Sequence, residues 1–130
     1  MAVLIDTHTL IWFLNKNDQL SSKALDVIEN TAIVYVSMAS LWEISIKTSI
    51  GKLTINGSFE SVLEDLSENN IQILPITFSH LNIQNGLKWH HRDPFDRLIV
   101  SQAIFEGYDI VSKDEILDAY MFDTSIKRIW

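Results

Sequence analysis

The chain has 130 residues, 47% of them hydrophobic, and its 17 Asp and Glu against 10 Lys and Arg give a net charge of −7. This length can bury a sizeable core, so we expect a single domain over residues 1–130. The sequence has no cysteine, which excludes disulfide frameworks, thiol nucleophiles and cysteine-based zinc sites. The acidic balance argues against a nucleic-acid partner, because phosphates repel acidic surfaces. No apolar run approaches the ~20 residues that span a bilayer, and no targeting segment is recognisable, so we expect a cytoplasmic protein that contacts no membrane.

Short apolar runs alternate with helical patterns along the whole chain. Ser21 or Ser22 and Ser37 are predicted N-caps, and Asp93-Pro94 and Gly107 bound the best-signalled helix. In chain order, we expect a strand at 3–5, a helix at 7–15, a helix ending at 30, a strand at 33–36, a helix at 38–49, a loop at 51–57, a helix at 58–69, a strand at 71–74, a helix at 78–87 broken near 85–86, a helix at 94–106, a strand at 109–112, a short helix after 114 and a last strand at 126–130.

This alternation predicts an α/β fold, a three-layer sandwich whose central, mainly parallel sheet of four to five strands carries helices on both faces. In such folds functional groups gather outside the carboxyl ends of the strands. Asp6 and Asp114 follow the strands at 3–5 and 109–112. Asp96 lies in the first turn of the helix that leads back to the second of these strands, so it belongs to the same edge. Glu43 lies about a turn and a half into the helix at 38–49. Four carboxylates are therefore expected to converge.

Each acidic residue also has a purely structural interpretation. Asp6 and Asp114 can cap the helices that follow them, Asp96 can be the capping-box partner of Asp93, and Glu43 can pair with a lysine four residues later. Convergence, however, makes carboxylates repel one another unless a cation joins them. Mg²⁺ or Mn²⁺, which prefer oxygen ligands, fit such a site and support phosphodiester hydrolysis by a metal-activated water.

Four stretches, in order and over essentially the whole chain, resemble the PIN-domain ribonucleases, and most closely the VapC-type toxins of type II toxin–antitoxin pairs. They are Leu4-Ile5-Asp6-Thr7-His8, Ala39-Ser40-Leu41-Trp42-Glu43-Ile44 with Gly51-Lys52-Leu53, His91-Arg92-Asp93-Pro94-Phe95-Asp96-Arg97-Leu98-Ile99, and Val111-Ser112-Lys113-Asp114. The resemblance implies a PIN-like fold, an RNA substrate, a homodimer and a cognate antitoxin that blocks the site. It also implies that Asp6, Glu43, Asp96 and Asp114 are the catalytic, metal-binding residues.

Some assignments around this quartet stay open. His8 stands where many relatives carry Ser or Asn. Asp93 competes with Asp96, although Asp96 matches the family's Asp-x-Leu-Ile pattern. The residues that can replace or assist Asp114 are Glu115 and Asp118, and those expected to support the ligands are Thr7 and Ser112.

Further residues are considered for RNA contact. We interpret His90-His91 as a solvated pair or a substrate contact rather than a metal site. Trp12 is interpreted as a core residue, with an oligomer or partner surface as the alternative, and Trp42 and Trp89 as packing residues, with base stacking as the alternative. The basic residues expected to hold RNA phosphates, unless they are only solvated charge, are Lys47, Lys52, Arg92 and Arg97. Without the four proposed ligands, 13 acidic and 10 basic residues remain, so acidity alone does not exclude RNA.

We therefore expect a metal-dependent endoribonuclease, the toxin of a toxin–antitoxin pair. The alternative is a non-catalytic PIN-like module that binds RNA or protein. A receiver-like domain with Lys113 as the basic partner of Asp6 fits less well, because it requires a phosphoacceptor Asp after a central strand, and Ser37 and Pro75 follow the middle strands.

Overall fold

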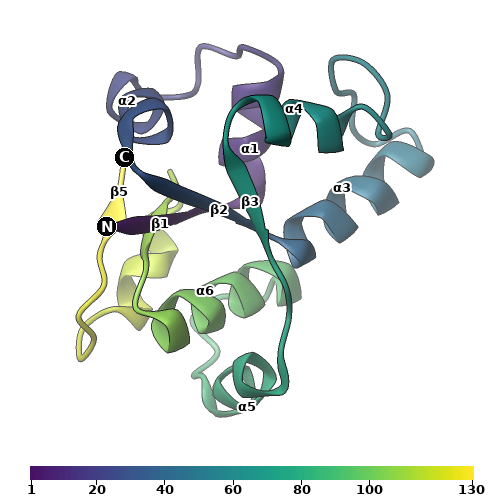
Figure 1. Cartoon of the computed structure of the whole chain (residues 1–130). Helices are drawn as coiled ribbons and strands as arrows, with labels where there is room; N and C mark the ends of the chain where they lie inside the picture. The colour runs from purple at the N-terminus through teal and green to yellow at the C-terminus, as the bar shows by residue number, and fades with distance from the viewer.

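A five-stranded parallel sheet forms the centre of the molecule, in a computed structural model that describes all residues from Met1 to Trp130 (Figure 1). The strand order is β3-β2-β1-β4-β5, and every neighbouring pair is parallel. The predicted parallel α/β architecture is therefore confirmed. The strands are β1 (Ala2–Ile5), β2 (Ile33–Ser37), β3 (Ile71–Leu74), β4 (Asp109–Val111) and β5 (Arg128–Ile129).

Six α-helices and one 3₁₀ helix connect the strands, and most begin at the caps that the sequence indicates. The hydroxyls of Ser21 and Ser37 each accept a backbone N–H of the helix that follows. Gly107 ends a helix with a left-handed φ of +76°, a conformation that favours glycine. The helices are α1 (Thr7–Leu14), α2 (Ser22–Asn30), α3 (Met38–Ser49), α4 (Val62–Glu68), α5 (Phe78–Gly86), α6 (Pro94–Glu106) and the 3₁₀ helix η1 (Glu115–Tyr120).

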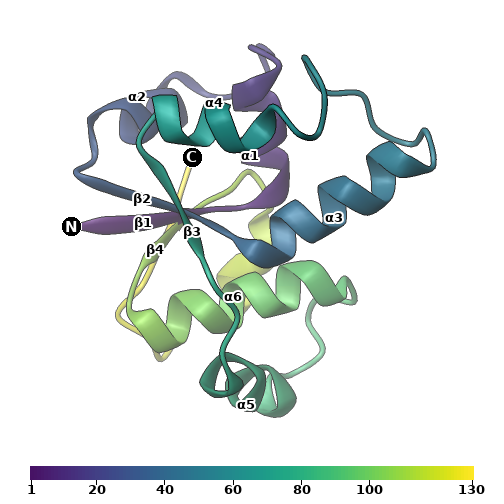
Figure 2. The same ribbon diagram turned by 45° about the vertical axis from the view of Figure 1, so that its right-hand side comes forward.

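The helices form two layers, one on each face of the sheet (Figure 2). Helices α1, α2, α3 and α4 contribute to a cluster of 16 buried apolar residues, together with one face of the strands. Helix α6 and η1 cover the opposite face with a second cluster of 10, and α5 packs on α6. Side chains alternate between faces along a strand, so Val3 and Ile5 belong to the first cluster and Leu4 to the second. No helix is both long and apolar enough to cross a membrane.

Two helix boundaries differ from the sequence prediction. Helix α4 begins at Val62 rather than after Ser58, because Ser58 and Ser61 close a separate turn: the Ser61 hydroxyl donates to the Ser58 carbonyl at 2.7 Å. Helix α5 continues unbroken to Gly86, although Asn85-Gly86 resembles a turn. Packing of α5 against α6 outweighs this local preference.

Candidate active site

The candidate site lies outside the carboxyl ends of β1 and β4, which are neighbours in the sheet. Asp6 follows β1 directly, and Asp114 stands three residues beyond the end of β4. The chain leaves β1 toward one face through α1 and leaves β4 toward the other through η1. This is the position at which parallel α/β sheets open a crevice. The sheet topology therefore brings together two acidic residues that are 108 positions apart in the sequence.

Asp6 is almost fully buried and serves as the N-cap of α1. Its Oδ1 accepts the Thr9 backbone N–H at 2.9 Å and lies 2.6 Å from the Thr9 hydroxyl, while its Oδ2 accepts the hydroxyl of Ser112. Burial raises the pKa of Asp6 above its ordinary value, and the hydrogen bonds from Ser112 and Thr9 oppose that effect without cancelling it. The carboxyl group is thus held rigidly in a place where its negative charge is poorly solvated.

Asp96 lies in the first turn of α6, and Asp93 caps that helix. One Asp93 carboxylate oxygen accepts the N–H of Phe95 at 2.8 Å and that of Asp96 at 3.3 Å. The Asp96 carboxylate makes no capping bond and is left to face the site. Burial, followed by the charges of Asp93, Asp6 and Glu43, raises the pKa of Asp96 to about 7, against a lowering effect of His91. Asp6 and Glu43 therefore lie close enough to act on Asp96.

Glu43 projects from α3 and is buried to 3% exposure. Its Oε2 pairs with Nζ of Lys47, one helical turn later, at 2.7 Å. The pKa of Lys47 is raised, first by its hydrogen bond to Glu43 and further by the charges of Glu43, Asp93 and Asp96, while partial burial opposes the rise. The i,i+4 ion pair that the sequence suggested is present, and the Lys47 ammonium group also faces the acidic cluster.

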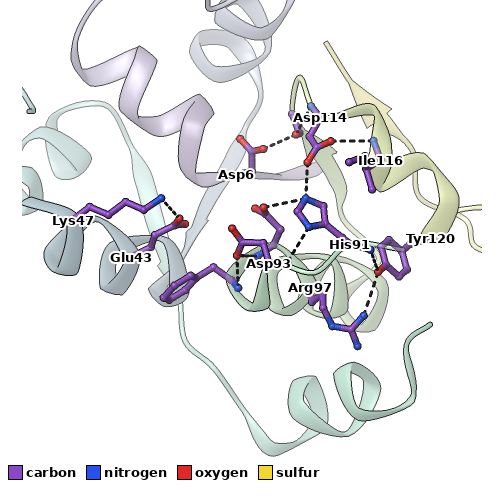
Figure 3. A network of polar contacts seen from close by, with 12 residues as sticks. Asp6, Glu43, Lys47, His91, Asp93, Arg97, Asp114, Ile116 and Tyr120 are labelled. Atoms are coloured by element: carbon purple, nitrogen blue, oxygen red, sulfur yellow. Dashed lines mark hydrogen bonds and ion pairs between the residues drawn. The ribbon is translucent and has the colours of Figure 1, made fainter. Parts of the chain in front are cut away.

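His91 belongs to this site, although the sequence analysis interpreted His90-His91 as a solvated pair or a substrate contact rather than a metal site. Its Nε2 lies 2.8 Å from Oδ2 of Asp114 and 3.3 Å from Oδ2 of Asp96, and these three atoms meet the spacing of a metal-ligand set (Figure 3). Its Nδ1 accepts the backbone N–H of Asp93 at 3.1 Å, so in the neutral ring the proton is on Nε2 and points at the two carboxylates. The only sequence signal was its place in the His-Arg-Asp-Pro stretch.

The residues expected to support the ligands divide into two cases. The Ser112 hydroxyl donates to Asp6 and accepts the N–H of Asp114 at 3.0 Å, so it joins the two strand ends. Thr7 instead donates to Ser40 at 2.9 Å and makes no hydrogen bond to Asp6. The threonine that holds Asp6 is Thr9, which the sequence analysis did not single out.

Arg97 is placed in the interior, at 1% exposure. Its guanidinium donates to the carbonyls of Lys88, Gln84 and Leu87 at 2.8 to 3.3 Å and lies 3.7 Å from the ring centroid of Trp89. This burial contradicts the expectation that Arg97 contacts RNA, since the group is used to fix the loop before α6.

The other basic residues considered for RNA contact stay accessible. Lys52 and Arg92 are exposed, and Lys47 is 40% exposed despite its ion pair. Among the tryptophans, Trp42 and Trp89 are 58% and 71% exposed. Most of the surface of each side chain is therefore open to solvent rather than packed, contrary to expectation.

The two acidic residues considered as substitutes for Asp114 point elsewhere. Asp118 forms a two-pronged ion pair with Arg128, at 2.8 and 3.1 Å. Glu115 is exposed in the first turn of η1. Asp114 alone is joined to the site, through Ser112 and His91.

The donor set fits a divalent cation. Asp6, Glu43 and Asp114, labelled in Figure 3, lie on the same side of the sheet, the charges of Asp6 and Glu43 act on Asp96, and His91 joins Asp96 to Asp114. Burial raises the pKa values of Asp6 and Asp96, and for Asp96 the charges of Asp93, Asp6 and Glu43 add to the effect, so the ionised carboxylates are poorly stabilised by their surroundings. A hard cation with oxygen ligands supplies that charge. Fold and site together define a parallel α/β protein with an acidic site at the carboxyl ends of its strands.

The PIN domain family model matches residues 3–123, and the chain belongs to the PIN domain family. This confirms the resemblance seen in the sequence motifs. Over 120 residues the chain is 28% identical to Ribonuclease VapC22 of Mycobacterium tuberculosis, and the match covers 92% of each protein.

Solved structures with the same fold are toxin–antitoxin complexes. VapBC2 from Rickettsia felis, bound to a DNA fragment from its promoter, matches with a TM-score of 0.69 and 17% identity over 98% of both chains. VapBC-5 from Mycobacterium tuberculosis matches with a TM-score of 0.65 and 16% identity over 98% of this chain and 97% of the other. At these identities the likeness shows the fold alone.

Proposed function

We propose that this protein is a metal-dependent endoribonuclease and the toxin of a toxin–antitoxin pair. The observation that carries the proposal is the gathering of acidic side chains from separate elements: burial and the charges of Asp93, Asp6 and Glu43 raise the pKa of Asp96 to about 7, and His91 joins Asp96 to Asp114. A fold needs no such cluster for its stability, because crowded buried charges destabilise it. Membership of the PIN domain family and similarity to a ribonuclease support the same reaction.

In this proposal Asp6, Glu43, Asp96 and Asp114 hold Mg²⁺ or Mn²⁺. The bound cation supplies activation of a water and neutralisation of the phosphate charge. Thr9 and Ser112 fix the orientation of Asp6, and His91 fixes that of Asp114.

The proposal assigns RNA binding to the accessible basic residues near the cluster. Lys47 faces the acidic cluster, and Lys52 and Arg92 are exposed on segments that adjoin α3 and α6. They hold the RNA phosphates without reading sequence. Arg97 takes no part in RNA binding.

We further propose that an antitoxin covers the site. Its docking surface is an apolar hollow of about 750 Å³ between α3 and α4, lined by residues that include Met38, Trp42, Phe59 and Leu63. Trp42 contacts Phe95 edge-on at 5.3 Å, and these residues directly adjoin Glu43 and Asp96 in the sequence. A segment seated in the hollow therefore lies against the helix that carries Glu43, and the net charge of −7 favours a basic segment.

A homodimer is also proposed. Large apolar side chains are exposed away from the α3–α4 hollow, among them Phe78 at 81% and Phe122 at 87%. Light scattering of the purified chain measures the mass in solution, and a mass of 14.9 kDa rather than twice that value would contradict the dimer.

The test of the proposed function uses the chain purified free of antitoxin. Mixed RNAs are incubated with Mg²⁺, with Mn²⁺ and with a chelator, in parallel with Asp6→Asn and with Asp118→Asn, a matched change outside the cluster. We expect cleavage that requires the metal and the Asp6 carboxylate but not Asp118. Metal-independent cleavage, or equal cleavage by Asp6→Asn, would overturn the proposal. RNA binding without any cleavage would favour the alternative, a non-catalytic PIN-like module.

A further inference from the structure

A hollow of about 290 Å³ opens directly beside the acidic cluster. Its walls are Asp6, His8, Trp12, Lys113 and Asp114. Two of these are proposed metal ligands, whereas the other three have no place in the proposed metal site. The hollow lies at the switch point of the sheet, between the start of α1 and the segment that follows β4. In parallel α/β folds this crevice is where ligands bind.

The walls provide an aromatic face and positive charge. His8 and Trp12 are one helical turn apart on α1, with ring centroids 5.7 Å apart and planes inclined at 45°. Nζ of Lys113 lies 5.7 Å from the Trp12 ring centroid. Trp130 packs edge-on against Trp12 at 5.8 Å, so the indole is supported from within the protein. Trp12 is thus a fixed, half-buried platform, with the exposed His8 beside it and the exposed Lys113 ammonium group over its ring.

The chemistry of these walls narrows the choice of ligand. The carboxylates of Asp6 and Asp114 repel an isolated anion, so the hollow does not suit a free phosphate. A planar, uncharged ring that stacks on Trp12 fits both the aromatic wall and the volume, which lies just below the ~300–1,000 Å³ typical of small-molecule pockets. Nucleobases are such rings, and they stack on indoles with little sequence preference. Lys113 is then available to the phosphate attached to that nucleotide.

We propose that this hollow binds one nucleobase of the RNA, stacked on Trp12, with Lys113 on the adjoining phosphate. This inference rests on the proposed function, because the metal site beside the hollow would hold the phosphate that is cut. The base in the hollow therefore belongs to the nucleotide next to the cleaved bond. His8, which stands where many relatives carry Ser or Asn, is another wall of the hollow.

Base removal tests the proposal. The cleavage position is first mapped on a short single-stranded RNA, and a series of the same RNA then carries one abasic nucleotide at each position in turn. We expect wild-type binding and cleavage efficiency to fall about 10-fold or more at one position next to the cleaved bond, the effect of losing one stacked base. In Trp12→Leu, removing the base at that position is expected to cause no further loss of binding or cleavage, because the variant has no indole on which the base can stack. Trp12→Phe is expected to restore most of the loss caused by removing the base.

Controls separate stacking from folding and from charge. Thermal melting checks each Trp12 variant, and Lys113→Ala, an exposed change, keeps the test available if Trp12→Leu does not fold. Lys113→Ala is expected to weaken RNA binding severalfold more than Lys127→Ala, which removes an exposed lysine far from the hollow.

The outcomes distinguish this proposal from the proposed function. Cleavage that depends on Asp6 would support the nuclease. If the effect of each abasic position is then the same in the wild type, Trp12→Leu and Lys113→Ala, the nucleobase site is overturned. If the wild type cleaves no RNA, the nuclease proposal fails. Binding of the abasic series then decides alone whether the hollow takes a base.

Discussion

Nε2 of His91 lies 2.8 Å from Oδ2 of Asp114 and donates its proton into the acidic cluster. The same atom lies 3.3 Å from Asp96, so one imidazole joins two carboxylates that come from different elements. The Asp93 N–H bonded to Nδ1 keeps the ring in this orientation. Asp114 is a third exposed, and without His91 only the N–H of Ile116 would restrain its side chain. His91 is therefore a positioning residue for the fourth carboxylate.

Replacing His91 tests this positioning role. We expect His91→Ala to weaken Mn²⁺ binding about 10- to 100-fold, the usual effect of losing a partner of a metal ligand. His91→Gln, which can still donate a hydrogen bond, is expected to restore part of the affinity. Mn²⁺ titration followed by electron paramagnetic resonance measures the affinity, and thermal melting in chelator monitors the fold. An unchanged Mn²⁺ affinity in His91→Ala would show that Asp114 needs no such partner.

Arg92 and Arg97 are five residues apart, but Arg97 is expected to stabilise the fold and Arg92 to bind RNA. Arg97→Met leaves the carbonyl of Gln84 in α5 and those of Leu87 and Lys88 in the following loop without their charged donor, so we expect the free energy of unfolding to fall by about 2–4 kcal/mol. Arg92→Ala removes only an exposed charge and is expected to leave that free energy unchanged. Instead, it lowers RNA affinity and makes the affinity less sensitive to salt. Urea unfolding and RNA binding at several salt concentrations measure both effects, and a salt dependence identical to the wild type would contradict the role of Arg92.

The raised pKa of Asp96 predicts a pH-dependent stability in metal-free protein. Below about pH 4 the carboxyl is protonated in both the folded and the unfolded chain. Between about pH 4 and about pH 7 the folded state retains a proton that the unfolded state has lost, so the free energy of unfolding falls as pH rises, by up to about 4 kcal/mol from this group. Above about pH 7 this contribution is constant.

Asp96→Asn removes this titration and provides the control. In chelator, the stability of Asp96→Asn relative to the wild type is expected to increase from pH 4 to pH 7 and then level off. Mg²⁺ should raise the melting temperature of the wild type most above pH 7, where the carboxylate is free to bind it. A stability difference that stays constant across this pH range would mean that Asp96 titrates normally.

The α3–α4 hollow predicts variants that escape the antitoxin. Phe59 and Leu63 are 42% and 65% exposed there and lie outside the acidic cluster. We expect Leu63→Asp and Phe59→Asp to retain RNA cleavage but to resist inhibition by the cognate antitoxin. Inhibitor titrations measure the loss, and Leu25→Asp, a change of an exposed residue on α2, is the control. Equal inhibition of all variants would place the antitoxin on another surface.

The positions of the strands and the acidic edge could be predicted because both depend on local patterns, whereas the order of the strands in the sheet came only from the structure. Apolar runs that end in an acidic residue, and caps such as Ser37 and Asp93, are visible in the sequence. The boundary of α4 and the role of His91 depend on contacts that no local pattern carries. The burial of Arg97 was equally hidden, since an arginine in the first turn of a helix is usually exposed and only the folded chain supplies its three carbonyls.

The most direct test of the central claim compares two aspartates three residues apart. Asp93 caps α6, a role that asparagine also fills, whereas the Asp96 carboxylate faces the acidic cluster. Metal-dependent cleavage of RNA is measured for the wild type, Asp93→Asn and Asp96→Asn under one set of conditions. The account predicts that Asp96→Asn loses at least about 100-fold in activity while Asp93→Asn stays within a few fold of the wild type. Full activity in Asp96→Asn, or an equal loss in both variants, would contradict it.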